Sequence, residues 1–133
     1  MTTERINPAE LARPSGFSHA VAATGAMVFL AGQLGTDRDG QVVPGGVVAQ
    51  FEQALSNLLA ALAAAGGHPS DLASLTIYLT DVDDYQAHAK EIGAAWRRLA
   101  SSDYPAMAGV GVAKLWLPGA VVEIQGIAVV SRS

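Results

Sequence analysis

The last part of the chain, residues 104–130, constrains the fold most, because it holds two apolar runs separated by turn residues. Small and β-branched residues fill positions 106–114, and residues 120–130 are almost wholly apolar. A Leu-Pro-Gly sequence at 117–119 supplies turn chemistry between the two runs. This pattern predicts two β-strands joined by a turn, and therefore a terminal hairpin.

One ionisable side chain, Glu123, lies inside the second of these strands. A carboxylate in a buried strand costs free energy unless it is hydrogen-bonded or paired, so its presence there needs a reason. Period-2 alternation places Gln125 on the same face of the strand. The pattern favours equally a catalytic carboxylate and a structural residue that reaches water at a strand end or an oligomer rim.

Upstream patterns predict a sequence of further strands and two helices. Phe51 and four leucines share one face of the first helix, which ends at a Gly-Gly pair. Asn57 lies in the middle of this helix, where its propensity is poor, so we expect it to bond to a neighbouring loop or chain. The predicted strands are 17–23 and 26–32, joined as a hairpin, then 41–43 and 75–79, and the predicted helices are 47–65 and 83–99. The resulting β-β-β-α-β-α-β-β order predicts an α+β fold, with strands in one layer and helices in the other.

The composition bounds the size of the molecule and indicates self-association. The chain has 133 residues, enough for one domain over residues 1–133 and one core. Half of its residues are hydrophobic, 15% are charged, and the mean hydropathy is +0.29. A domain of this size has too little interior to hide so much apolar surface, so we expect part of it in a subunit interface. A high alanine content is the alternative explanation.

Charge and residue usage exclude several classes of function. The net charge is −4, and no basic cluster is larger than Arg97-Arg98, so binding to nucleic acid has little electrostatic support. The absence of cysteine removes disulfides, thiol nucleophiles and thiolate metal sites. The start of the chain lacks the apolar segment of a signal peptide, and no apolar run reaches the ~18 residues of a membrane helix. We therefore expect a cytoplasmic protein that contacts neither nucleic acid nor membrane.

The histidines do not indicate a metal site. His19, His68 and His88 lack metal-ligand spacing to one another and to paired carboxylates. We expect His88 at the surface or at the edge of the helix stripe. A cluster of Asp81, Asp83 and Asp84 is better explained as helix-capping chemistry than as a cation site. The sequence thus predicts neither a metal nor another cofactor.

Four segments together resemble the reactive-intermediate deaminase (Rid, or YjgF) family. They are YPA at 104–106 followed by a strand and LPGAVVEIQGIAV, FLAGQLGTD at 29–37, QFEQALSNLLAALAAAG at 50–66, and LASLTIYLTD at 72–81. The resemblance implies a chorismate-mutase-like α+β fold in which a mixed sheet packs on two helices. It also implies a homotrimer with small-molecule clefts between subunits, where enamine or imine intermediates are hydrolysed. The family has carried a ribonuclease description, which the acidic charge balance does not favour.

The resemblance also names the residues of the expected cleft. Glu123 is the family glutamate and the expected catalytic residue, and the expected substrate-binding residues are Phe17, Ala31, Gly32, Met107 and Gly109. Several of these differ from typical deaminating members. Met107 stands where an arginine clamps the substrate carboxylate, and Gly109 where a small polar residue or cysteine is usual. Ala31 replaces a serine, Ala89 an asparagine, and Phe17 an aromatic residue that is usually tyrosine.

These departures leave two functions open. The cleft either hydrolyses a less polar imine or enamine, with Glu123 positioning water, or belongs to a non-catalytic trimeric protein that binds a ligand or serves a structural role. Strand alternation places Met107, Gly109 and Gly111 on one face, where the glycines either leave room for a bulkier ligand or permit close packing. A chorismate-mutase-type enzyme ranks last, because the cleft positions supply no cation for a dicarboxylate. Whether Arg13 or Arg38 reaches the cleft stays open.

Overall fold

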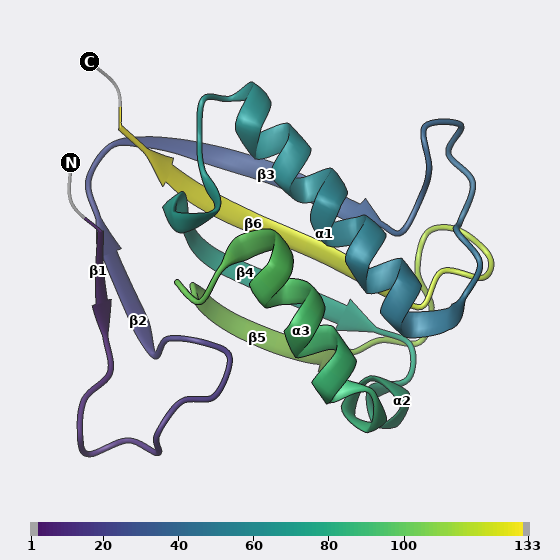
Figure 1. The fold of residues 1–133 in the computed structure, drawn as a ribbon, viewed down its shortest axis with the longest axis horizontal. Helices are drawn as coiled ribbons and strands as arrows, with labels where there is room; N and C mark the ends of the chain where they lie inside the picture. Colours follow the sequence, from purple (N-terminus) through teal and green to yellow (C-terminus); the bar gives the residue numbers. More distant parts are fainter. Residues whose placement is uncertain (1–2, 132–133) are drawn as a thin grey trace.

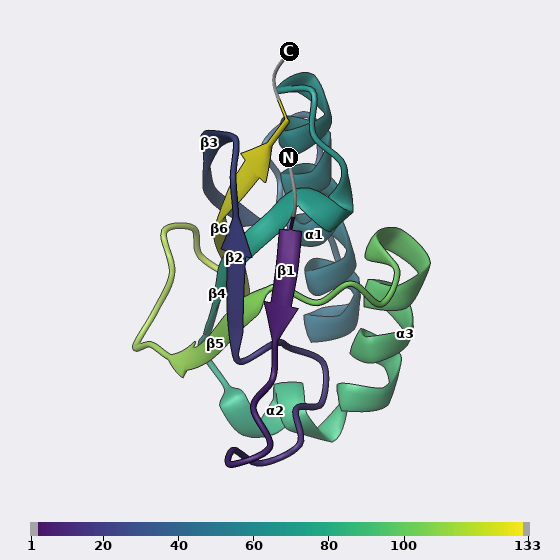
Figure 2. The same ribbon diagram turned by 90° about the vertical axis from the view of Figure 1, so that its left-hand side faces the viewer.

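A four-stranded mixed sheet forms the centre of the computed structural model, which describes residues 3–131 (Figure 1). Its strand order is β3 (Ala26–Leu34), β6 (Val122–Val130), β4 (Leu72–Leu79) and β5 (Ala106–Gly111). β6 is antiparallel to both of its neighbours, and β5 runs parallel to β4. The helices α1 (Gly46–Ala64) and α3 (Ala89–Ala100) lie on one face of this sheet (Figure 2). The remaining elements are β1 (Thr3–Ile6) and β2 (Ala20–Ala23), which form a separate pair, the 3-10 turn η1 (Pro69–Asp71), and the short helix α2 (Val82–Ala87).

The core lies between α1, α3 and the sheet face that they cover. The predicted stripe of α1 is buried there, and Leu55, Leu58 and Leu62 have no exposed surface. By length and composition alone, α1 is the one described helix that is apolar enough to cross a membrane, with a mean hydropathy of 1.2. Core helices meet the same criterion, and the stripe of α1 packs on the sheet.

Alternation along β6 separates the two faces of the sheet. Val122, Ile124 and Ala128 are fully buried beneath the helices, whereas Glu123 and Gln125 lie on the opposite face. We call this opposite face, which the helices do not cover, the open face. Large apolar side chains are exposed there, with Phe29 72% and Met27 59% accessible. The apolar excess of the composition is thus partly displayed on the surface of the single chain.

The α+β class, the mixed sheet and the packing on helices are confirmed, but both predicted hairpins are wrong. β5 and β6 are not neighbours, because β6 lies between β3 and β4 while β5 occupies the far edge. Residues 112–121 carry the chain from that edge across β4. At the other end of the chain, β2 pairs with β1 and β3 pairs with β6. The apolar β3 therefore completes its hydrogen bonds with the equally apolar β6 rather than with its neighbour in sequence.

Two smaller predictions are also corrected. Residues 41–43 form an isolated bridge from Val42 to Thr36 rather than a strand. The second helix is interrupted at His88, which separates α2 from α3. There the His88 Nδ1 hydrogen bond with the Asp84 carbonyl (2.8 Å), together with the nearby Asp84 and Glu91 carboxylates, raises the pKa of the imidazole. Asp81 caps α2 as predicted, because its carboxylate accepts a hydrogen bond from the Asp84 amide.

Asn57 links α1 to the loop after β3, as its unfavourable position in the helix predicted. Its Nδ2 donates to the carbonyls of Leu34 (3.2 Å) and Thr36 (2.9 Å). Its Oδ1 accepts a hydrogen bond from Gln53 Nε2 at 2.9 Å. The side chain thus holds the end of β3, which carries the predicted residues Ala31 and Gly32, against the helix.

We expect Asn57→Ala to lower the free energy of unfolding by about 1–3 kcal/mol, because two partly buried carbonyls lose their donor. Urea titration at one fixed protein concentration measures this change. Ser56→Ala, on the neighbouring position of α1, is the matched control and should change stability by less than about 0.5 kcal/mol. Equal unfolding midpoints for the two variants would contradict the role assigned to Asn57.

Candidate functional site

The predicted site residues lie on two opposite faces of the sheet. Met107 on β5 is opposite Leu75 in the register, on the face that the helices cover. Glu123 on β6 is opposite Tyr78, on the open face. The backbone of a pleated sheet separates these two side chains, so one chain does not bring Glu123 and Met107 into the same cavity.

Glu123 lies over a bulge in β3. The register between β3 and β6 shifts between Leu30 and Gln33, which places Ala31 and Gly32 in the irregular segment. A β-carbon at Gly32 would overlap the Oε2 atom of Glu123. Within residues 3–131 the Glu123 carboxylate forms neither a hydrogen bond nor an ion pair. The glycine therefore lets a half-buried, unpaired carboxylate lie directly on the backbone of β3.

On the helix side, a cavity of about 300 Å³ lies between α1, α2, α3 and the start of β5. We call it the aromatic pocket, because two aromatic pairs form much of its wall. Phe51 and Tyr85 meet edge to face with centroids 6.1 Å apart, and Trp96 stacks on Tyr104 at 6.0 Å. The residues that line it are Ser15, Gly16, Phe51, Tyr85, Ala89, Ile92, Gly93, Trp96, Arg97, Tyr104 and Met107.

Several sequence expectations meet at this pocket. Met107 and Ala89, two positions at which the chain departs from the family pattern, both line it. Gly109 lies two residues further along the same strand, with open space where a β-carbon would be. Gly111 differs, because a β-carbon there would lie 3.2 Å from Val82. The room expected from the glycines is therefore present at Gly109, and the close-packing alternative applies to Gly111.

The structure places the remaining candidates nearby or elsewhere. Phe17 follows the pocket residues Ser15 and Gly16, and its ring meets His19 edge to face at 5.1 Å. The cation that lines the aromatic pocket is Arg97, whereas sequence reasoning had considered Arg13 and Arg38. Arg97 lies in the last turn of α3, where the helix dipole by itself accounts for a basic residue. Ala89, Gly93 and Arg97 follow one another at intervals of four residues, so they share one face of the helix. This spacing is the signal that could have placed Arg97 on the same side of the helix as Ala89.

Polar groups in the aromatic pocket are mainly hydrogen-bond donors. Trp96 is 4% exposed, and its Nε1 has no hydrogen-bond partner among the described residues. Burial raises the pKa of Tyr85 to about 12, so its hydroxyl keeps its proton throughout the physiological range. Arg97 adds a permanent positive charge, and no carboxylate is among the lining residues.

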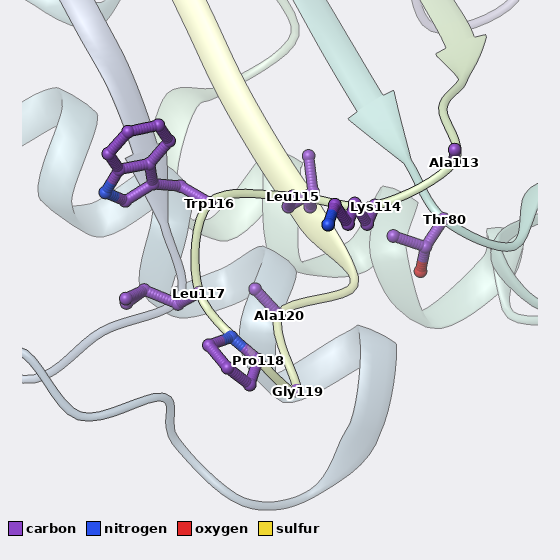
Figure 3. Close-up of a pocket in the computed structure, with 9 residues that line it drawn as sticks. All are labelled: Thr80, Ala113, Lys114, Leu115, Trp116, Leu117, Pro118, Gly119 and Ala120. Atoms are coloured by element: carbon purple, nitrogen blue, oxygen red, sulfur yellow. The ribbon is translucent and has the colours of Figure 1, made fainter.

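A second and larger cavity, of about 670 Å³, lies in the connection between β5 and β6 (Figure 3). It is lined mostly by that connection, and Trp116 there is 89% exposed. Gln50 of α1 holds the end of the connection, since its Nε2 donates to the Gly119 carbonyl and its Oε1 accepts from the Val121 amide. Lys114 faces this cavity rather than the aromatic pocket.

The described residues contain no group of three or more His, Cys, Asp or Glu side chains that could hold a metal ion.

Comparison with known proteins identifies the family. Residues 8–130 match the protein family described as Endoribonuclease L-PSP. The 2-iminobutanoate/2-iminopropanoate deaminase of Capra hircus is 39% identical over 103 residues, which span 77% of this chain and 72% of that protein. Among solved structures, the Rid-family protein YyfB from Yersinia pestis has a TM-score of 0.84 at 33% identity. The match covers 98% of this chain and 100% of the YyfB chain. Escherichia coli TdcF with bound serine has a TM-score of 0.69 at 30% identity, with 90% of this chain and 91% of that one covered. The resemblance found in the sequence is thus confirmed, and this chain belongs to the Endoribonuclease L-PSP family, the group that includes the Rid proteins.

Proposed function

We propose that this protein hydrolyses the C=N bond of 2-imino acids, or of their enamine tautomers, to 2-oxo acids and ammonia. The reaction takes place in clefts between the subunits of a homotrimer. The relative from Capra hircus is described as a deaminase of such imines, and the family glutamate is present as Glu123. The observation that carries the proposal is the unpaired Glu123 carboxylate lying on the Gly32 backbone.

The separation of the site residues supports a cleft made by two subunits. β5 is an edge strand, and Met107 lies where the aromatic pocket meets that edge. A neighbouring subunit whose open face packs beside this edge would add its own Glu123 and Gly32 to the pocket. The exposed Phe29 and Met27 on the open face give such packing its apolar surface.

In this cleft Glu123 is the general base. The substrate reacts as the protonated imine, and Glu123 accepts a proton from the water that attacks its carbon, so that the C–O bond forms and a neutral carbinolamine results. Glu123 then returns that proton to the carbinolamine nitrogen. The C–N bond breaks and ammonia leaves, while the hydroxyl group passes its proton to Glu123 and becomes the carbonyl. Transfer of this proton to ammonia or to water restores the Glu123 carboxylate. Water is the co-reactant, and no group is oxidised or reduced.

Met107 indicates that the substrate differs from the smallest 2-imino acids. A bidentate arginine supplies charge and two directed donors to a carboxylate, whereas a thioether supplies neither. Burying a small substrate's carboxylate against Met107 would add a desolvation cost. A ligand-binding protein without catalysis is the competing function, because the same departures that weaken the usual binding would also weaken turnover.

The first test is the oligomeric state. Light scattering at micromolar concentration should give three times the 13.6 kDa chain mass. Phe29→Lys places a charge on the apolar open face, so it should shift the mass toward the monomer. Ala60→Lys, at an exposed position of α1 on the helix side of the sheet, is the control and should leave the trimer intact. A stable monomer of the unmodified protein would remove both the interface and the shared cleft.

Glu123→Gln should lower the rate of imine hydrolysis by at least ~100-fold, because the amide cannot take a proton from water. Gly32→Ala keeps the carboxylate but forces it from its place, and should cost roughly 10- to 100-fold. The rate is measured as loss of an enzymatically generated imine against the same mixture without protein. Glu52→Gln, in the helix layer, is the matched control. Unchanged turnover in Glu123→Gln, with the trimer intact, would contradict the assigned base.

We further expect the protein to be a poor catalyst with 2-iminopropanoate. Loss of one buried charged contact typically weakens binding or rate by roughly 30- to several-thousand-fold. Met107→Arg should recover only part of this, since Ala31 and Ala89 also lack the polar groups of typical members. The measurement compares this protein with an arginine-containing relative under one set of conditions. Equal acceleration by the two proteins would contradict the significance given to Met107.

A further inference from the structure

We infer that the aromatic pocket selects 2-imino acids with a large apolar side chain, and that Arg97 is the cation that receives their carboxylate. This inference rests on the proposed function for the choice of reaction, but it concerns binding and can be tested without turnover.

Arg97 is free to bind an anion. Its neighbour Arg98 forms a salt bridge with Glu52, whereas Arg97 forms no ion pair with any residue in the described part of the chain. Both arginines are exposed on α3, but only Arg97 is among the residues that line the aromatic pocket. The two adjacent arginines therefore differ in role, one bound to α1 and the other available at the pocket.

Gly93 allows the guanidinium to lie along the helix at the pocket. An added β-carbon at Gly93 would lie 3.3 Å from Arg97 Nη1, a tight contact. Gly93 also lines the pocket, one turn before Arg97. The Arg97 guanidinium therefore lies close to Gly93, on the side of α3 that lines the pocket.

The chemistry of the walls matches an apolar anion. Phe51, Ile92 and Met107 give an apolar surface, and no carboxylate lines the pocket to oppose a negative ligand. Tyr85 keeps its proton and can donate a hydrogen bond. The arginine is exposed at the rim while the apolar walls lie inside, so a ligand would bury its side chain and leave its carboxylate at Arg97.

The size of the pocket sets the substrate class. Its volume of about 300 Å³ is at the lower end of small-molecule sites, and is enough for a phenyl or branched aliphatic group. The methyl group of 2-iminopropanoate would leave most of this apolar wall in contact with water. Binding should therefore strengthen as the apolar side chain grows.

The experiment uses the stable 2-oxo acid products as probes and measures their binding by calorimetry. Phenylpyruvate should bind at least ~10-fold more tightly than pyruvate. Arg97→Gln should weaken phenylpyruvate binding by ~10-fold or more, and Arg97→Lys by less, because the charge is retained without the bidentate geometry. Arg98→Gln is the matched control and should change the affinity by less than ~2-fold, since Arg98 faces Glu52.

Equal affinities for pyruvate and phenylpyruvate, or identical binding by the Arg97→Gln and Arg98→Gln variants, would overturn the inference. Imine hydrolysis by the unmodified protein, measured beside these binding titrations, separates this inference from the proposed function. If phenylpyruvate binds in an Arg97-dependent way but no imine is hydrolysed, the inference holds and the proposed hydrolysis fails. If imines are hydrolysed but Arg97→Gln binds phenylpyruvate as tightly as the unmodified protein, the proposed hydrolysis holds and this inference fails.

Discussion

The pairing of β6 with both β3 and β4 is the constraint on which the rest of the structure depends. Because β6 is central, its alternate residues must serve two surfaces at once. Val122 and Ile124 complete the core under α1, while Glu123 between them is held on the open face. Burial of Val122 and Ile124 in the core thus fixes the Glu123 carboxylate on the open face. No ion pair from the described residues contributes to this placement.

The sequence predicted local features well and strand partners poorly. The α1 stripe, the Asp81 cap and the bonds of Asn57 follow from spacing and propensity within one or two segments. The terminal hairpin was wrong because the turn chemistry at 117–119 indicates a reversal of the chain but not which strand lies beside it. β4 separates β5 from β6, and that choice depends on the crossover through α2 and α3, which brings β5 parallel to β4.

In the candidate site, too, the identities of residues could be predicted from the sequence, whereas their arrangement in space could not. Met107, Ala89 and Glu123 could be named from the family pattern, and the space at Gly109, two residues after Met107, could be anticipated from the glycine. The distribution of these residues over two faces of the sheet could not be predicted. It follows from the strand register, which sets Met107 opposite Leu75 and Glu123 opposite Tyr78. Arg97 was missed for a related reason: a basic residue in the last turn of a helix has an adequate local explanation in the helix dipole. Its place beside the aromatic pocket becomes evident only from the cavity that α3 and the start of β5 line together.

The central claim is that each site combines the aromatic pocket of one subunit with Glu123 of another, and subunit mixing tests it most directly. Glu123→Gln subunits keep the pocket, and Ala89→Trp subunits keep the glutamate but fill the pocket. Each variant alone should be inactive. Random equal mixing after unfolding and reassembly should restore about a quarter of the unmodified activity, because one cleft in four then joins an intact pocket to an intact glutamate. Mixed trimers that stay inactive, in an assay where the unmodified protein is active after the same treatment, would contradict the account.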